Sequence, residues 1–164
     1  MLRKALPLFC CLLLLLAAVH PVSSAATKAP SFELSTLEGD QVSLQELTTD
    51  GRHLLLVFWT TWCPSCRKTM PEVDQLRSDH SPSNLSVLGI NAGWNDSRSR
   101  AVRFRDKHGL SFPICFDRGS RISKKYSIRG VPTLYLVDPS GRIRYQGYSV
   151  NMQLLELLEK ISSE

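Results

Sequence analysis

Apolar residues along the chain occur as unbroken runs that alternate with stripes of helical spacing. Residues 53–60 (HLLLVFWT) and 85–91 (LSVLGIN) are near-continuous apolar runs, which are typical of strands covered on both faces. Each run precedes a segment of helical periodicity, at residues 66–76 and 97–108, and Pro71 predicts a kink in the first of these helices. The order strand, helix, strand, helix predicts a parallel βαβ unit in an α/β domain.

Shorter elements are expected on both sides of this unit. We interpret residues 27–31 as a linker, and residues 31–42 (SFELSTLEGDQV) as a small hairpin around a Gly39-Asp40 turn signal. The other predicted elements are a short helix that starts at the capping box Ser43–Glu46, an extended piece at 112–116, a short helix at 120–126, strands at 133–137 and 142–146, and a last helix whose apolar face holds Leu154, Leu155, Leu157 and Leu158.

The N-terminus has the three-part plan of a secretory signal. The basic residues Arg3 and Lys4 precede an apolar run at 5–19, and small residues follow at 23–26. The apolar run is shorter than the roughly 18 to 20 residues that a spanning helix needs, so cleavage is favoured over retention as an anchor. We therefore predict a signal peptide at 1–26, a single domain at 27–164, and a periplasmic or other extracytoplasmic location.

Charge argues against nucleic acid as a partner. Of the 20 Lys and Arg residues, Arg3 and Lys4 lie in the signal, whereas all 15 acidic residues follow it, so the mature chain carries a net charge of about +3. Basic residues are scattered among acidic ones. The densest group, which we interpret as the solvated face of a helix, is Arg98, Arg100, Arg103 and Arg105.

The strongest candidate for chemistry is the segment Cys63-Pro64-Ser65-Cys66, which lies between a buried strand and a helix. A thiol at a helix N-terminus meets unpaired N–H groups and the positive end of the helix dipole, which stabilise its thiolate. We therefore expect Cys63 to be the nucleophile and Cys66, one turn later, to be the resolving thiol. Cys115 lies in an apolar context and is interpreted as a buried small hydrophobe.

Two other roles for the cysteine pair are less favoured. A permanent disulfide across so short a loop removes little chain entropy from the unfolded state and stabilises little. A zinc or copper site would need further ligands beyond the two cysteines, and His53, His80 and His108 stand alone. No metal and no cofactor are expected.

Residues 58–71 (FWTTWCPSCRKTMP) resemble the active-site segment of thioredoxin-like proteins, and are most similar to the extracytoplasmic TlpA/ResA-type thiol-disulfide oxidoreductases. Residues 129–133 (RGVPT) match the segment in which that superfamily carries a cis-proline beside the CxxC motif. The resemblance covers about residues 30–162. It implies a thioredoxin-like fold with a central mixed sheet flanked by helices, an N-terminal hairpin and a helix-containing insert.

The same resemblance indicates which residues contact the substrate. An X-Pro bond is the one peptide linkage in which a cis form costs little, and a cis bond between Val131 and Pro132 would turn backbone groups toward the thiols. An extended substrate could pair there as an added strand. Trp62 is expected to present a flat apolar surface to the partner, and the predicted substrate-binding residues are Trp62, Pro64, Ser65 and Val131.

The sequence departs from classical thioredoxins at the position of their proton carrier. Those proteins have a buried aspartate six residues before the first active-site cysteine, and this chain has Val57 there. TlpA/ResA-like proteins tend to place an acid after the second strand. Asp96 is the nearest acid and is our candidate proton carrier, although an aspartate before Ser97 could equally cap the following helix.

The resemblance implies a reductase of extracytoplasmic protein disulfides, in a role like cytochrome c maturation, that receives electrons from a membrane thiol donor and acts as a monomer. A peroxiredoxin-like peroxidase is a second hypothesis, because Thr60-x-x-Cys63 fits its motif, but Leu56 occupies the position of the expected proline. A copper-binding assembly factor on the same fold is a third hypothesis. Such a site would take a late histidine, and none follows His108.

Overall fold

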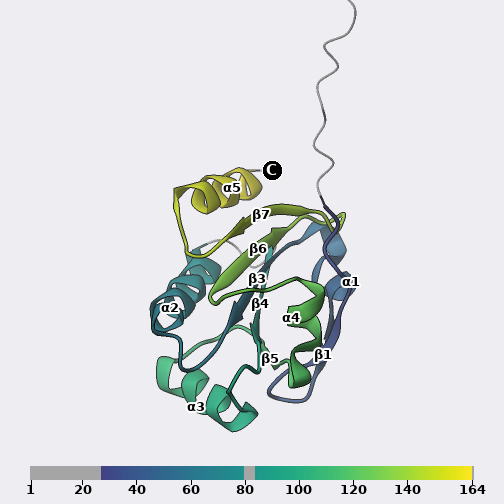
Figure 1. Cartoon of the computed structure of the whole chain (residues 1–164). Helices are drawn as coiled ribbons and strands as arrows, with labels where there is room; N and C mark the ends of the chain where they lie inside the picture. Colours follow the sequence, from purple (N-terminus) through teal and green to yellow (C-terminus); the bar gives the residue numbers. More distant parts are fainter. Residues whose placement is uncertain (1–26, 80–83, 164) are drawn as a thin grey trace, which may run out of the picture.

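The computed structural model describes residues 27–79 and 84–163. Five strands form a mixed sheet in the order β5-β4-β3-β6-β7, in which β3, β4 and β5 are parallel and β6 and β7 are antiparallel to their neighbours (Figure 1). This sheet contains β3 (His53–Trp59), β4 (Leu85–Asn91), β5 (Ile114–Phe116), β6 (Thr133–Val137) and β7 (Ile143–Gly147). The predicted α/β thioredoxin-like architecture is confirmed.

Helices and a hairpin cover the two faces of the sheet. The hairpin pairs β1 (Glu33–Ser35) with β2 (Gln41–Ser43), and it is followed by α1 (Leu44–Leu47) and the 3-10 turn η1 (Thr49–Gly51). The other helical elements are α2 (Pro64–Asp79), α3 (Arg98–His108), η2 (Arg118–Ser120), α4 (Arg121–Lys125) and α5 (Met152–Ser162). Pro71 lies inside α2, and the helix continues beyond it. No helix in the described part of the chain is long and apolar enough to cross a membrane.

Alternate residues of β3 separate two hydrophobic clusters. Leu55, Val57 and Trp59 pack with side chains of α2, α3 and α5, whereas Leu54, Leu56 and Phe58 pack under the hairpin, α1 and α4. Strand residues point alternately to opposite faces, so a strand buried on both faces must be apolar at every position. The unbroken run in the sequence arises for this reason.

The expected linker at residues 27–31 is wrong. The backbone N–H of Ala29 donates to the Gly141 carbonyl at 2.9 Å, and the N–H of Ile143 donates to the Thr27 carbonyl at 2.9 Å. Lys28 pairs with Arg142 as an antiparallel bridge. The segment is therefore attached to the turn between β6 and β7, and three extended residues leave no periodic pattern from which this pairing could be predicted.

The interpretation of the arginine group as a solvated helix face is only partly right. The guanidinium of Arg98 donates to the carbonyl of Leu37, and that of Arg105 donates to the Glu38 carboxylate. Both acceptors lie in the turn between β1 and β2. Side chains from the start and the last turn of α3 therefore hold the hairpin against the domain.

Strand register brings five loops to one end of the sheet. Trp59 is opposite Asn91 and Asn91 is opposite Phe116, so the chain leaves β3, β4 and β5 side by side. β6 begins opposite Phe58, and β7 ends opposite Leu134. The loops that adjoin these strand ends span residues 60–63, 92–97, 117–120, 127–132 and 148–151, and we call this side of the molecule the disulfide end.

Candidate active site

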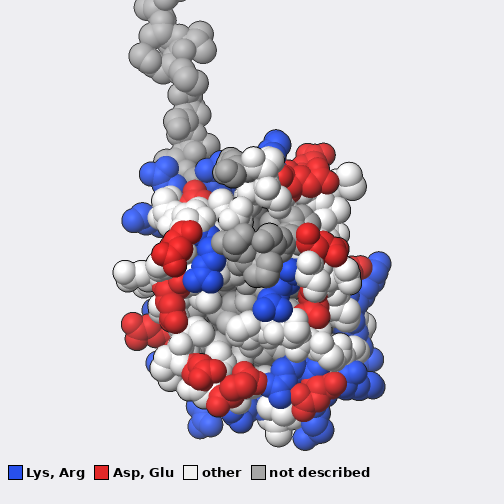
Figure 2. All heavy atoms as spheres, turned by 180° about the vertical axis from the view of Figure 1, so that it is seen from behind, with Lys and Arg blue, Asp and Glu red and all other residues white. Residues whose placement is uncertain are grey.

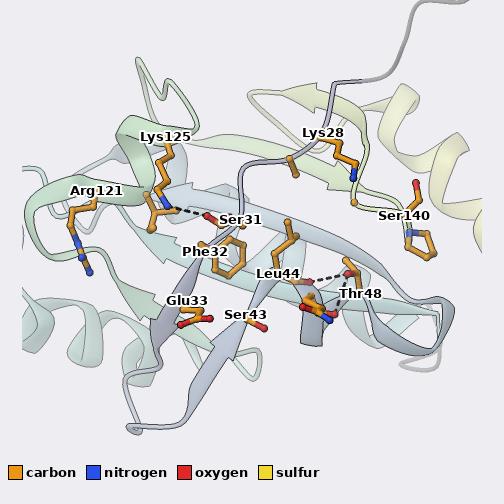
Figure 3. Close-up of a pocket in the computed structure, with 15 residues that line it drawn as sticks. Lys28, Ser31, Phe32, Glu33, Ser43, Leu44, Thr48, Arg121, Lys125 and Ser140 are labelled. Atoms are coloured by element: carbon orange, nitrogen blue, oxygen red, sulfur yellow. Dashed lines mark hydrogen bonds between the residues drawn. The ribbon is translucent and has the colours of Figure 1, made fainter.

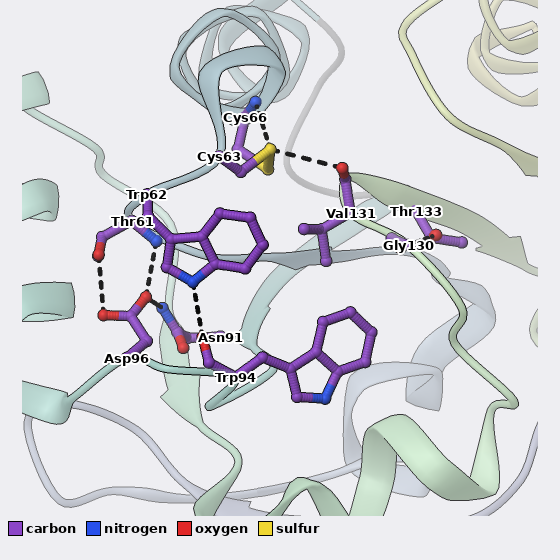
Figure 4. The surroundings of a disulfide bond; sticks show 10 residues. All are labelled: Thr61, Trp62, Cys63, Cys66, Asn91, Trp94, Asp96, Gly130, Val131 and Thr133. Atoms are coloured by element: carbon purple, nitrogen blue, oxygen red, sulfur yellow. Dashed lines mark hydrogen bonds between the residues drawn. A yellow bond between two sulfur atoms is a disulfide. The ribbon is translucent and has the colours of Figure 1, made fainter.

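Cys63 and Cys66 form a disulfide at the N-terminus of α2, with their Cα atoms 5.3 Å apart (Figure 4). The backbone N–H of Cys66 donates to Cys63 Sγ at 3.1 Å, as expected where a helix begins with unpaired N–H groups. Cys63 is 3% exposed and Cys66 is fully buried. The two predicted thiols therefore lie together, and Cys63 is the more accessible.

The predicted proline loop lies against this disulfide. The bond between Val131 and Pro132 is cis, as expected. The carbonyl oxygen of Val131 lies 3.4 Å from Cys63 Sγ, and Thr133 Oγ1 donates to the Gly130 carbonyl at 2.7 Å within the same loop. Pro132 is buried and Val131 is half-buried, so the backbone of Val131 forms one wall of the site.

Two tryptophans near the site, Trp59 and Trp62, have different environments. Trp59, the last residue of β3, is fully buried and packs against Phe104, with ring centroids 4.7 Å apart, so it belongs to the core. Trp62 is 47% exposed, and its Nε1–H donates to the Trp94 carbonyl at 2.6 Å. Pro64 and Ser65 are exposed beside it. The indole of Trp62 is thus a fixed apolar surface next to Cys63 (Figure 4).

The Asp96 carboxylate holds the loop that leads to the cysteines. One oxygen accepts from the backbone N–H of Thr61 at 2.6 Å and from Asn91 Nδ2 at 2.8 Å. The other accepts from Thr61 Oγ1 at 2.8 Å and from the N–H of Ser97 at 2.9 Å. The N-cap of α3 is Ser97, whose hydroxyl accepts from Arg100, so the alternative role of Asp96 as that cap is wrong.

Sequence reasoning missed Thr61 and Asn91 as parts of this arrangement. The two residues lie 30 positions apart, and each alone is an ordinary polar residue at the end of a strand. The available signal was their shared position, because Thr61 follows β3, Asn91 ends β4, and parallel neighbours end side by side. Asp96 therefore bridges two adjacent loops of the site.

The inner wall of the site is apolar where classical thioredoxins have an aspartate. Val57 is fully buried and belongs to the same hydrophobic cluster as Cys63 and Cys66. Cys115 lies on the other face of the sheet, is fully buried and has no disulfide partner. Burial raises the pKa of the Cys115 thiol to about 12, so this residue is the buried small hydrophobe that its context predicts.

Two other kinds of site come into question, a metal site and a groove away from the disulfide. Residues 27–79 and 84–163 contain no group of three or more His, Cys, Asp and Glu side chains placed to hold a metal ion. A groove of about 960 Å³ opens between the N-terminal segment, α1, α4 and the β6–β7 turn (Figure 3). None of the predicted site residues lines that groove; its charged lining residues are Lys28, Glu33, Arg121 and Lys125.

Comparison with known proteins agrees with this geometry. The model of the AhpC/TSA family matches residues 25–146. The chain belongs to this family. It is 33% identical over 149 residues to the thiol-disulfide oxidoreductase ResA of Halalkalibacterium halodurans, a match that covers 90% of this chain and 82% of that protein. The predicted resemblance to ResA-type proteins is therefore confirmed.

Solved structures of the same kind share the fold. StoA from Bacillus subtilis superposes with a TM-score of 0.67 at 26% identity, covering 83% of this chain and 98% of that one. A thiol-disulfide oxidoreductase from Bacteroides fragilis superposes with a TM-score of 0.70 at 27% identity, covering 82% and 98% of the two chains. The fold of these two proteins thus agrees with the family assignment.

Proposed function

We propose that this thiol-disulfide oxidoreductase reduces protein disulfides outside the cytoplasm. The observation that carries the proposal is the Cys63–Cys66 disulfide at the start of α2, with the Val131 carbonyl 3.4 Å from Cys63 Sγ. Sequence similarity to ResA, a protein named as a thiol-disulfide oxidoreductase, supports the same chemistry.

The reaction starts from the dithiol form of the pair. The Cys63 thiolate attacks one sulfur of the substrate disulfide and forms a mixed disulfide, and the other substrate sulfur leaves as a thiolate that takes up a proton. Cys66 then loses its proton and attacks Cys63 Sγ, which releases the second substrate thiol. Two electrons pass to the substrate, and Cys63 and Cys66 become the disulfide seen here.

The environment of each cysteine supports this division of roles. Cys63 retains some exposure, and its sulfur accepts the Cys66 N–H, which also stabilises a thiolate at that position. Cys66 is fully buried behind it, so only a partner already joined to Cys63 comes within its reach. Trp62 and Val131 lie beside Cys63 (Figure 4), Pro64 and Ser65 follow it in the chain, and these four residues are the proposed substrate contacts.

The backbone of Val131 is suited to hold an extended polypeptide. Its carbonyl lies against Cys63 Sγ, so a substrate strand that pairs with this loop brings its own cysteine to the reacting sulfur. Asp96 contributes by fixing Thr61, and through it the approach to Cys63. Its role as a proton carrier remains a prediction from the sequence, and both of its oxygens already accept internal hydrogen bonds.

Export and the electron donor complete the proposal. The predicted signal lies at residues 1–26, outside the described residues, and export by it would bring the domain to a compartment where protein disulfides persist. Re-reduction of the pair there needs a thiol donor that carries electrons across the membrane. Maturation of c-type cytochromes, which requires reduced cysteines in the target protein, is the role that we propose for the reductase.

The reduction potential of the Cys63–Cys66 pair tests the direction of the reaction. Equilibration of the purified protein with dithiothreitol or glutathione buffers should give a value near or below the roughly −270 mV of thioredoxin. A value near the roughly −120 mV of a strong oxidant would reverse the direction. The Cys66→Ser variant should accumulate the mixed disulfide with substrate, whereas Cys63→Ser should form none.

A peroxidase is the second candidate, because the AhpC/TSA family model matches the chain and Thr60-x-x-Cys63 is present. In that reaction the Cys63 thiolate would attack a peroxide oxygen, and Cys66 would condense with the resulting sulfenic acid. Peroxide consumption by the reduced protein distinguishes the two activities. Consumption faster than disulfide reduction would favour the peroxidase.

A further inference from the structure

The charged residues of the described chain are unevenly distributed between the disulfide end and the rest of the molecule. Building on the proposed function, we propose that the disulfide end is a cationic docking rim for protein substrates whose reactive cysteine is flanked by Asp and Glu. The rim consists of the exposed basic residues in the loops and first helical turns around the disulfide. Its members are Arg67, Lys68, Arg98, Arg100, Arg118, Arg121 and Arg129.

Acidic residues on the same segments are engaged inside the protein. Residues 60–68, 92–100, 117–121, 127–132 and 147–152 contain seven basic residues but only two carboxylates, Asp96 and Asp117. Asp96 accepts four hydrogen bonds, and Asp117 is fully buried and accepts from the N–H groups of Ile122 and Ser123 and from the Ser123 hydroxyl. No carboxylate is therefore exposed within these described segments, and the nearest counter-charge recorded for a rim residue is Glu72, which lies 3.8 Å from Lys68 Nζ.

Three rim residues lie on the segments that carry the groups lining the site. Arg100 Nη1 donates to the Asn95 carbonyl at 3.1 Å, beside Trp94, whose own carbonyl binds the Trp62 indole. Arg129 lies two residues before Val131, and Arg67 follows Cys66. These basic residues thus belong to α2, to the first turn of α3 and to the proline loop.

The rest of the described chain has a different balance. Outside the five segments it contains 11 basic and 12 acidic residues, so the positive charge of the domain belongs to the disulfide end. Figure 2 shows acidic and basic side chains interspersed over the face opposite to that of Figure 1. By these counts, a ligand that approaches the disulfide meets an excess of positive charge.

Charge complementarity identifies the partner. A field of the same sign as the substrate's charge slows the encounter of enzyme and substrate. A field of the opposite sign raises the association rate by roughly 10- to 1,000-fold at low ionic strength. The exposed Trp62 indole at the centre favours a polypeptide, because it offers an apolar contact inside the charged rim. A cysteine with acidic neighbours matches both features.

Three peptides test the proposal, each with one internal disulfide and identical except for Glu, Gln or Lys beside the cysteines. The full chain, reduced beforehand, should reduce the Glu peptide roughly tenfold faster than the Lys peptide at low salt. The difference should fall below about twofold in 0.5 M salt, because the Debye length is then only a few ångströms. Equal rates for the three peptides at low salt would overturn the proposal.

Matched double variants locate the effect on the rim. In Arg100→Gln/Arg129→Gln the ratio of the Glu rate to the Lys rate should fall toward one. Arg142→Gln/Lys160→Gln removes the same charge from exposed residues at the opposite end of the sheet. Arg142 forms a backbone β-bridge with Lys28 there, and the carbonyl of Ile161, the residue after Lys160, accepts a hydrogen bond from Asn84 just before β4. That control should keep the wild-type ratio of the Glu rate to the Lys rate. A fall of this ratio in both double variants would contradict the proposal that the effect comes from the rim.

Fluorescence anisotropy with peptides that carry Ser in place of Cys separates docking from chemistry. If no peptide is reduced, the proposed reductase function fails, yet tighter binding of the Glu peptide that depends on Arg100 and Arg129 would still support the rim. The same variants are tested on vesicles that contain anionic lipid. Rim-dependent vesicle binding without discrimination among the peptides would assign the charge to a membrane surface and overturn the proposal.

Discussion

Asp96 binds Thr61 through two hydrogen bonds, one from the backbone N–H at 2.6 Å and one from the hydroxyl at 2.8 Å. Thr61 stands two residues before Cys63, so the carboxylate fixes the segment that presents the nucleophilic sulfur. The contact joins residues 35 positions apart and connects the loop after β3 to the loop after β4. It makes Asp96 a positioning residue for the redox pair.

Asp96→Asn should destabilise the fold and loosen this loop. An amide offers one oxygen where the carboxylate offers two, and its NH₂ group would face the Thr61 or Ser97 donors, so buried donors would lose acceptors. We expect a loss of about 1 to 3 kcal/mol in the free energy of unfolding, measured with urea. The reduction potential should shift as well, because the Cys63 environment changes.

Asp50→Asn is the matched control for this substitution. Asp50 is exposed and adopts a positive φ of 59°, a conformation that asparagine tolerates as well as aspartate does. Its unfolding free energy should stay within about 0.5 kcal/mol of wild type. Equal effects of the two variants would show that the Asp96 hydrogen bonds contribute nothing specific.

Asp138 should make stability depend on pH in the acid range. Its burial alone would raise the pKa of the carboxyl, but hydrogen bonds from the Ser140 hydroxyl and from the N–H groups of Arg142 and Ser140, together with the charge of Arg144, lower that pKa overall. A lowered folded pKa stabilises the protein above the unfolded pKa of roughly 3.9, and the contribution disappears as pH falls through the folded value.

The Asp138→Asn variant measures that contribution. Its unfolding free energy should lie about 1 to 3 kcal/mol below wild type at pH 7, and the gap should narrow as the pH falls below roughly 4. Urea denaturation at pH 7, 5 and 3 follows the gap. A difference that stays constant over this range would mean that the Asp138 charge plays no part.

The redox site could be predicted largely because its parts leave local signatures. Cys63 and Cys66 are spaced by one helical turn after an apolar strand, and Pro132 precedes another strand, so short windows of sequence identify them. The clamp formed by Thr61, Asn91 and Asp96 leaves no such signature. Its members are ordinary polar residues that meet only because β3 and β4 end in register.

Long-range contacts explain the errors elsewhere. Residues 27–29 join the turn at 141–143 across more than 100 positions, and Arg98 reaches the carbonyl of Leu37 in the hairpin. Neither contact requires a periodic pattern or a characteristic residue type. The rim likewise could not be identified from composition, because its residues come from segments that only the sheet topology brings together.

Cys115 should be inert toward thiol reagents in the folded protein. It is fully buried, and burial raises its pKa to about 12, so almost no thiolate forms at pH 8. In a mature chain of residues 27–164 that carries Cys63→Ser and Cys66→Ser, a colorimetric thiol reagent should detect no cysteine until denaturant is added. Detection of one thiol under native conditions within minutes would contradict the buried environment.

Gly93→Ala should disturb the loop that supports Trp62. Gly93 has a φ of +73°, and a Cβ atom added there would lie 2.7 Å from the backbone carbonyl oxygen of Asp117. Backbone cannot move aside as a flexible side chain can, so Ala adds a steric clash to the roughly 1 to 2 kcal/mol that a left-handed conformation costs an L-residue. Trp94 is the next residue, and its carbonyl accepts from the Trp62 indole, so the displacement should reach Trp62.

Gly109→Ala separates the cost of the steric clash from the cost of the left-handed conformation. Gly109 has a φ of +60° as the C-cap of α3, and an added Cβ there would meet no atom within 4 Å. Unfolding in urea should therefore show a larger loss for Gly93→Ala than for Gly109→Ala, and only the former should change Trp62 fluorescence and slow disulfide reduction. Equal losses of unfolding free energy in the two variants would mean that the loop shifts away from Asp117 at no cost. The close approach of Gly93 to the Asp117 carbonyl would then not fix the position of Trp62.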